Sequence, residues 1–265
     1  MMLKDNILEY VPKRPCPVAS CCFATPAEPV DVKALIPDAN LRRRMGPLLR
    51  LAAACGMAAL GNVDTGNVAG IITSTGLGFM KDTVNFADML IDRNEEMLNP
   101  SPFMQSTFNT VSGYIALLGG IRTYNTAYVH RSGGFAAALT DAMMLVGDGN
   151  VLVGGFDEAS PEVDEYRRKL GCWKRGDFLP LGEGAGFLCL GGGDNGVRIL
   201  GVHSSRHTLE FDCKVLCSSY IDRLGAFFSI LPVVLCIVIG QRPQGRILVV
   251  DDVNPGGHAV LLEID

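Results

Sequence analysis

The chain has 265 residues, of which 48% are apolar and 19% are charged, and its formal net charge is −5. This composition indicates a globular protein that buries a large core in one large domain or two small ones. The negative charge and the lack of a dominant basic stripe exclude a typical nucleic-acid-binding protein.

The first half of the chain alternates short apolar runs with helical periodicity. Apolar residues recur at three- and four-residue steps from Leu41 to Ala59 and predict a helix that Gly61 ends. Asn99-Pro-Ser-Pro is a predicted break in the chain. We expect strands at 19–24, 68–73, 123–128 and 151–154, and helices at 82–97, from Ser106 or Thr110 to 119, and at 132–146.

The second half begins with a polar segment, 161–174, that we expect to be exposed. A glycine-rich turn at 181–186 runs into a buried strand, and 197–202 is its predicted hairpin partner. A buried helix is expected over 222–239, followed by a hairpin of 247–251 with 259–263. The alternation of strands and helices predicts an α/β fold with a largely parallel or mixed sheet covered on both faces.

No targeting or membrane segment is visible. The N-terminus lacks a basic region followed by an apolar core, and the most apolar run, 227–240, contains Pro232 and is too short to cross a bilayer. We therefore expect a cytoplasmic, soluble protein without a membrane span.

Three consecutive arginines, Arg42 to Arg44, form the tightest basic cluster. Such a cluster is most often a solvated helix face, and docking of an acidic carrier protein is the sharper alternative. The nine cysteines are scattered and often lie in apolar runs, which indicates buried reduced thiols. Cys213 and Cys217 share a helical spacing, but no further ligands complete a zinc set, so we expect no metal and no cofactor.

The glycine-rich turn after the strand 68–73 does not indicate nucleotide binding. Thr75-Gly-Leu-Gly-Phe-Met lacks the third glycine of a dinucleotide fingerprint, and no Gly-Lys-Ser/Thr follows it. Close packing of a strand against a helix is the ordinary explanation for such glycines.

Several motifs, taken together and in order, resemble the β-ketoacyl synthases, enzymes of the thiolase fold. The pieces are Leu41-Arg-Arg-Arg-Met, Thr73-Ser-Thr-Gly-Leu-Gly, Gln105-Ser-Thr-Phe-Asn-Thr-Val-Ser-Gly, Leu181-Gly-Glu-Gly-Ala-Gly and Gly256-Gly-His-Ala-Val-Leu-Leu. The ungapped interval from His130 to Gly147-Asp148 matches the family's interval from nucleophile to Gly-Glu. The resemblance covers 41–203 well and 222–265 more loosely.

The resemblance implies a thiolase-like fold in a single domain, 1–265, with an N-terminal half at 1–203 and an abbreviated C-terminal half at 204–265. Glu28-Pro, Tyr128-Val-His-Arg and Gly154-Gly-Phe-Asp-Glu are similar to the short synthase-like proteins of aryl polyene and flexirubin-type pigment pathways. The resemblance to the synthases also implies a dimer through the region around 105–120 and 124–129.

The family's catalytic residues are replaced in this chain. His130 stands where the nucleophilic cysteine is expected, at a predicted buried turn that opens into the helix 132–146. Ala226 stands where the Gly-His motif places one histidine. The His-Gly-Thr-Gly-Thr segment that supplies the other is not found, although His203 and His207 lie in the shortened region. An acyl-imidazole hydrolyses readily, so His130 would hold an acyl chain poorly.

Other polar residues near this position have ordinary explanations. Ser132 would be acylated only if His130 acted as its base, and a backbone-satisfied imidazole is the plain alternative for His130. His258 is predicted either to border the same cavity or to be an exposed turn residue. Asp157 and Glu158 are adjacent and point in different directions. Glu183 is expected to hydrogen-bond backbone N–H groups in its own turn.

The resemblance favours a non-elongating synthase homologue that pairs with an active synthase, as chain-length-factor subunits do, and shapes the acyl tunnel from across the interface. An acyl carrier protein and a partner synthase, or a second copy of the chain, are the expected partners. His130 and Ser132 are positional catalytic candidates. The residues expected at the pocket are Phe108, Asn109, Tyr128, Phe135, Ala226, Gly256, Gly257 and His258.

Two alternatives remain at this stage. The first is an acyltransferase or thioesterase of the same fold that uses His130 or Ser132. The second is a protein that binds acyl chains or a carrier protein without a partner synthase.

Overall fold

The computed structural model describes residues 9–192, 195–204 and 209–265. His207, named above, lies outside these ranges. The strands are β1 (Cys16–Ala24), β2 (Val68–Thr75), β3 (Tyr124–Val129), β4 (Asn150–Asp157), β5 (Lys174–Arg175), β6 (Asp177–Phe178), β7 (Gly184–Leu190), β8 (Val197–Ser204), β9 (Cys213–Leu216), β10 (Gly245–Val250) and β11 (His258–Ile264). The α-helices are α1 (Val32–Leu35), α2 (Ala39–Arg44), α3 (Pro47–Leu60), α4 (Met80–Asp92), α5 (Pro100–Ser106), α6 (Thr110–Gly119), α7 (Gly134–Leu145), α8 (Pro161–Leu170), α9 (Ile221–Leu224) and α10 (Ile230–Gln241).

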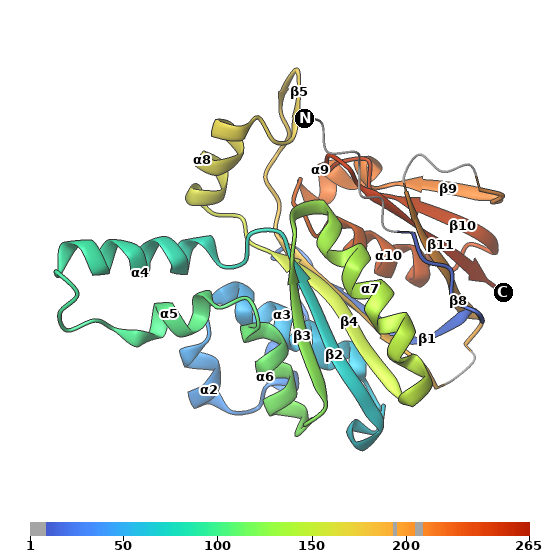
Figure 1. Ribbon diagram of the computed structural model, residues 1–265, viewed down its shortest axis with the longest axis horizontal. Helices are drawn as coiled ribbons and strands as arrows, with labels where there is room; N and C mark the ends of the chain where they lie inside the picture. Colours follow the sequence, from blue (N-terminus) through green and yellow to red (C-terminus); the bar gives the residue numbers. More distant parts are fainter. Residues whose placement is uncertain (1–8, 193–194, 205–208) are drawn as a thin grey trace.

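One mixed sheet runs through the molecule (Figure 1). Among the described residues its strand order is β3-β2-β4-β7-β1-β8-β11-β10-β9. The strand β1 joins its two parts, because it pairs with β7 on one side and with β8 on the other. The predicted α/β class with a mixed sheet is confirmed.

The two parts of the sheet repeat one arrangement. In the first, β1 is antiparallel to β7, β7 is antiparallel to β4, and β4 is parallel to β2. In the second, β8 is antiparallel to β11, β11 is antiparallel to β10, and β10 is parallel to β9. The helices α7 and α10 precede the matching strands β4 and β10. The sequence shows no repeat period, so this duplication of topology is visible only in the structure.

Helices cover the two faces of the first part of the sheet. The helices α7 and α10 pack on one face and α3 and α6 on the other. Side chains of β2, β4 and β7 point alternately to the two faces of the sheet, and each face has its own apolar core. Ile72 and Val153 lie in the core with α7 and α10. Ile71 and Leu152 lie in the core with α3 and α6. Burial on both faces explains why these strands read as continuous apolar runs.

The predicted hairpin of 181–190 with 197–202 is wrong. The strand β7 pairs with β1 and β4, and β8 pairs with β1 and β11. The strand β1 lies between β7 and β8 in the sheet. The hairpin of β10 with β11 is confirmed, with Val249 opposite Val260.

Two predicted helix boundaries also change. The expected helix 222–239 is split into α9 and α10, because Gly225 has a φ of +73° and ends α9. Asn99-Pro does not only break the chain; the Asn99 side chain accepts from Ser101 N at 3.0 Å and Pro100 begins α5. The helices α4 and α5 project from the body of the molecule (Figure 1), and Phe86 stacks on Phe103 between them.

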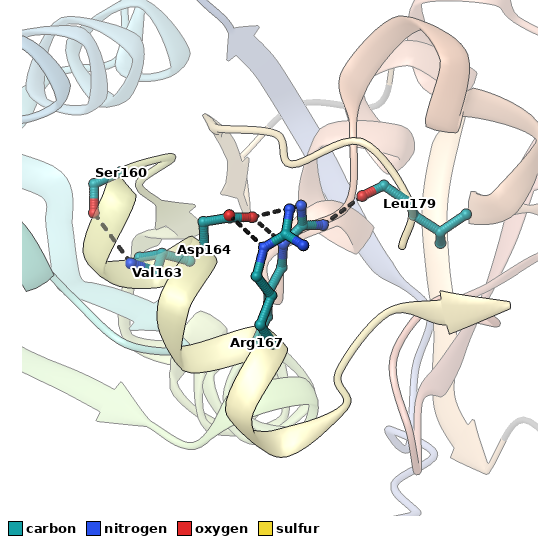
Figure 2. Close-up of polar contacts among 6 residues, drawn as sticks. Ser160, Val163, Asp164, Arg167 and Leu179 are labelled. Carbon is teal, nitrogen blue, oxygen red and sulfur yellow. Dashed lines mark hydrogen bonds and ion pairs between the residues drawn. The ribbon is translucent and has the colours of Figure 1, made fainter. Parts of the chain in front are cut away.

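The segment 161–174 is not uniformly exposed, contrary to the prediction. Ser160 caps α8 through Val163 N, and Arg167 is buried. Figure 2 shows the Arg167 guanidinium between Asp164 and the Leu179 carbonyl oxygen, with Nη2 at 2.6 Å from Asp164 Oδ1. These contacts fasten α8 to the chain that leads back to the sheet. No helix in the described ranges is long and apolar enough to cross a membrane.

Arg167 and Arg168 provide a matched test of this fastening. Both pair with Asp164, but the Arg167 side chain is 6% exposed and the Arg168 side chain 57%. We expect Arg167→Ala to lower the free energy of unfolding by about 1–3 kcal/mol, because a buried hydrogen-bonded charge is lost. Arg168→Ala should cost less than about 1 kcal/mol. Urea denaturation measures both; equal effects would contradict the buried role of Arg167.

Candidate functional site

The turns that follow β2, β4 and β10 meet the starts of α7 and α10 at one edge of the sheet. We call this region, residues 75–78, 130–134, 226–229 and 254–258, the corner. The strands β2 and β4 are parallel and end together, whereas β10 runs antiparallel to them through the sheet. Contacts between the segments, such as Ser229 N to Asp157 and Ser132 Oγ to Pro255 O, bring them together. The corner is where the predicted catalytic candidates lie.

A buried carboxylate at the end of β4 organises the corner. Asp157 Oδ1 accepts from Thr75 Oγ1 and Gly76 N, both at 2.9 Å, and Oδ2 accepts from Ser229 N at 2.7 Å. It therefore ties the glycine-rich turn after β2 to the start of α10. Burial raises the pKa of Asp157, and the hydrogen bonds offset this only in part. The glycine-rich turn is thus held by a side chain, in agreement with its structural interpretation.

A second buried carboxylate occupies the matching place after β10. Asp251 Oδ1 accepts from Val253 N and Asn254 N, both at 3.1 Å, and Oδ2 accepts from Asn254 Nδ2 at 2.9 Å. Burial raises the pKa of Asp251 to about 7 despite these bonds. A Cβ on Gly257 would lie 1.9 Å from Asp251 O, so the turn can close only with glycine at that position.

Sequence reasoning missed three residues of the corner: Trp173, Phe228 and Asn254. Trp173 Nε1 donates to Asn254 Oδ1 at 2.8 Å, and the Trp173 and Phe228 rings lie 4.7 Å apart. Asn254 Nδ2 also donates to the Phe227 and Phe228 carbonyl oxygens, both at 3.2 Å. Trp173 is the only tryptophan in the chain. A single tryptophan in an otherwise polar segment was the available signal that this segment is anchored.

His130 lies at the corner, but it is exposed, contrary to the prediction that it is buried. Its side chain is exposed, and its backbone carbonyl oxygen accepts from Gly134 N at 2.6 Å as the chain enters α7. The packed turn predicted around His130 therefore opens to solvent. An imidazole in water is a poor holder of an acyl group, because nothing shields the acyl-imidazole from hydrolysis.

Ser132 is committed to a different contact. Its Oγ donates to Pro255 O at 2.7 Å, which ties the start of α7 to the turn before β11. The hydroxyl proton thus points at a backbone carbonyl oxygen rather than at an imidazole base. This geometry does not support activation of Ser132 as a nucleophile.

His258 is buried, with an exposed fraction of 8%, and not an exposed turn residue. Burial lowers its pKa first, and the nearby His130 lowers it further, so the imidazole remains neutral. Among the described residues, His258 Nδ1 has no hydrogen-bond partner. His130 lies near enough to His258 to affect its pKa, although His130 faces solvent.

The predicted pocket residues separate into two groups. Near the corner, Phe135 is buried in the core, and Ala226 N donates to Pro180 O at 2.7 Å. Tyr128 OH donates to Asp141 Oδ2 at 3.1 Å, and burial together with this carboxylate raises the pKa of Tyr128 to about 12. These side chains and backbone groups pack or bond within the protein.

Phe108 and Asn109 lie on the outer side of the sheet, and both are exposed. They line a shallow depression of about 630 Å³ together with Asn125, Ala127 and Val129 of β3. The strand β3 ends the sheet, and Tyr124 and Val129 on it are exposed. Phe108 and Asn109, two of the residues expected at the pocket, therefore lie at the open edge formed by β3.

The acidic candidates have structural partners. Glu183 Oε2 accepts from Ala159 N at 3.0 Å, so it bonds a neighbouring segment and not its own turn. Glu158 Oε2 accepts from Lys81 N at 3.1 Å, away from the contacts of Asp157. No group of three or more histidine, cysteine or acidic residues suited to a metal ion occurs within the described ranges.

Comparison with known proteins gives the family. The model of the β-ketoacyl synthase N-terminal domain matches residues 17–170, more than half of the chain. The chain belongs to the β-ketoacyl synthase family. No curated protein matches it.

Solved structures with the same fold include synthases and their companion subunits. The ishigamide ketosynthase/chain length factor has a TM-score of 0.72 at 14% identity, with 95% of this chain and 99% of that chain covered. The ketosynthase ApeO in complex with its chain length factor ApeC, from Xenorhabdus doucetiae, has a TM-score of 0.63 at 16% identity, with coverages of 95% and 100%. The type II acyl-carrier protein–ketosynthase complex AntDE:AntF has a TM-score of 0.68 at 15% identity, with coverages of 94% and 99%. These likenesses confirm the thiolase-like fold.

The raised pKa of Asp251 predicts how stability depends on pH. The folded pKa of about 7 lies above the ordinary value of 3.8, so the folded state binds the proton more tightly than the unfolded state. The contribution of Asp251 to stability is therefore lost as the pH rises from about 4 to about 7 and is constant above. Relative to the unchanged protein, Asp251→Asn should gain stability across this window.

Urea denaturation at several pH values between 5 and 8 measures this difference. Asp212→Asn is the control, because Asp212 is exposed and accepts a hydrogen bond from Arg246 N at 2.8 Å. If the difference in stability between Asp251→Asn and the unchanged protein does not vary with pH, the raised pKa of Asp251 is contradicted.

Proposed function

We propose that the chain is a non-elongating β-ketoacyl synthase homologue that pairs with an active synthase and helps to set acyl-chain length. The observation that carries this proposal is the state of the nucleophile position. His130 there is exposed, and the Ser132 hydroxyl is bonded to Pro255 O. A family member without a protected nucleophile cannot accept a growing chain as a stable thioester.

The open edge of the sheet supports the pairing. The outer edge of β3 has no strand beside it in the part of the chain that the structure describes, and unpaired edges of this kind bind further chains. Phe103, Met104, Phe108 and Leu117 are exposed on the adjoining helices α5 and α6 and their connection. Exposed apolar residues that cluster beside a sheet edge favour an interface over a solvated face.

A groove beside this edge supports the carrier-protein partner. It has a volume of about 790 Å³ and an apolar floor that includes Met104, Tyr114 and Leu117. Arg43 and Arg44 form its rim. Basic side chains around an apolar floor suit an acidic protein that delivers an acyl chain.

The neighbours support the same proposal at the level of fold. Two of them are described as a ketosynthase with a chain length factor. The rival enzyme, an acyltransferase or thioesterase, would need Ser132 or His130 to act, and the contacts of both residues disfavour it.

Co-expression with a synthase encoded beside this chain tests the pairing. We expect a heterodimer by native mass spectrometry. Val129→Asp on the outer edge of β3, where Val129 is 41% exposed, should reduce the heterodimer at least tenfold, because it places a charge in the interface. Val11→Asp, at a 65% exposed position outside this edge, is the control. A chain that stays monomeric or forms only homodimers would contradict the proposal.

Phe108 tests control of chain length. Its ring lies against Gly78 and its exposed part borders the depression at β3. In the reconstituted pair we expect Phe108→Ala to lengthen the products by at least one elongation unit, because it removes bulk from the interface. Phe211→Ala, at a 40% exposed position in the connection before β9 and away from this edge, should leave product length unchanged. Product masses that do not change in Phe108→Ala would contradict this role.

A further inference from the structure

Four cysteines meet where β1 joins the two parts of the sheet. Cys21 and Cys22 lie on β1, Cys55 lies on α3, and Cys236 lies on α10. The strand β1 contacts both helices, which cover opposite faces of the sheet. Because side chains alternate along a strand, Cys21 and Cys22 point to different faces.

The packing assigns each strand cysteine to one helix cysteine. Cys21 packs against the core that contains Cys236, and Cys22 packs against the core that contains Cys55. Cys55 Sγ lies 3.2 Å from Cys22 O, and Cys21 Sγ lies 3.9 Å from Cys236 O. Both helix thiols thus lie against the backbone of β1, since Cys236 Sγ is also 3.3 Å from Cys22 O. Side-chain hydrogen bonds then pair Cys22 with Cys55 and Cys21 with Cys236.

Each pair combines one accessible and one enclosed thiol. Cys21 and Cys22 are partly exposed, whereas Cys55 and Cys236 are buried. The hydrogen bond from Cys55 lowers the pKa of Cys22, and the hydrogen bond from Cys236 lowers the pKa of Cys21. Burial raises the pKa of Cys55 and of Cys236. A reactive accessible thiol beside a second thiol is the arrangement found in oxidation-sensitive proteins.

We infer that a peroxide oxidises these four cysteines to two disulfides, Cys22–Cys55 and Cys21–Cys236. The thiolate of Cys21 or Cys22 attacks a peroxide oxygen, so that an S–O bond forms, the O–O bond breaks and one water leaves. The partner thiol then attacks the sulfenic sulfur, so that the S–S bond forms, the S–O bond breaks and a second water carries away its proton. Each disulfide therefore consumes one hydrogen peroxide and releases two waters.

The two disulfides would join β1 to both of its covering helices. Since β1 is also the strand that links the two parts of the sheet, oxidation would fix both parts to one another. This inference concerns the core at β1 and is independent of the proposed pairing with a synthase.

The test uses the whole protein, hydrogen peroxide, and alkylation of the remaining thiols after denaturation. The reduced protein has nine free cysteines, and we expect five alkylated cysteines after oxidation, because each of two disulfides removes two. Tryptic mapping should join the peptide that contains Cys21 and Cys22 to those of Cys55 and Cys236. The oxidised protein should also unfold at a higher temperature.

Single substitutions separate the two pairs. Cys21→Ser should retain only the link to Cys55, and Cys22→Ser only the link to Cys236. Cys16→Ser, at a buried position on the same strand, should retain both links. Nine alkylated cysteines after peroxide, a Cys21–Cys22 link, or oxidation that stops at sulfenic or sulfinic acid would each overturn the inference.

Discussion

The hydrogen bonds that Asp157 accepts are the constraint on which the corner depends. One buried carboxylate holds the glycine-rich turn after β2, through Gly76 N, and the start of α10, through Ser229 N. A buried charge is stable only when its oxygens are hydrogen-bonded, so the backbone around it has little freedom. Asp251 has the same role after β10, where it shapes the turn that brings Pro255 O to Ser132. The duplicated topology thus places one ordering carboxylate in each part of the sheet.

The hydrogen bonds at the corner hold the fold together, and they leave few polar groups free to act on a substrate. The corner is tied together by Ser132, Asn254 and Trp173, whose polar groups bond to the protein itself. The residue at the family's nucleophile position, His130, is exposed, and the neutral imidazole of His258 lies near it. Several of the exposed apolar residues of the chain lie along β3, α5 and α6.

Much of the fold could be predicted because local patterns and topology agree. The continuous apolar runs of β2 and β4, and the hairpin of β10 with β11, follow from burial on both faces and from turn chemistry. The wrong hairpin of β7 with β8 shows the limit, since no local signal indicates that β1 pairs between them. The anchoring of Trp173 and the burial of Arg167 depend on contacts with Asn254 and Leu179 that are distant in sequence. The exposure of His130 likewise depends on how segments distant in sequence pack around the start of α7, which a motif cannot show.

The central claim is that this chain holds no acyl group of its own. Intact mass measured after incubation with acyl-carrier-protein thioesters tests it most directly, with the active partner synthase as the positive control. The account predicts that the partner gains the mass of the acyl group and that this chain does not. A stable acyl adduct on this chain, mapped to His130 or Ser132, would contradict the account and favour an enzyme.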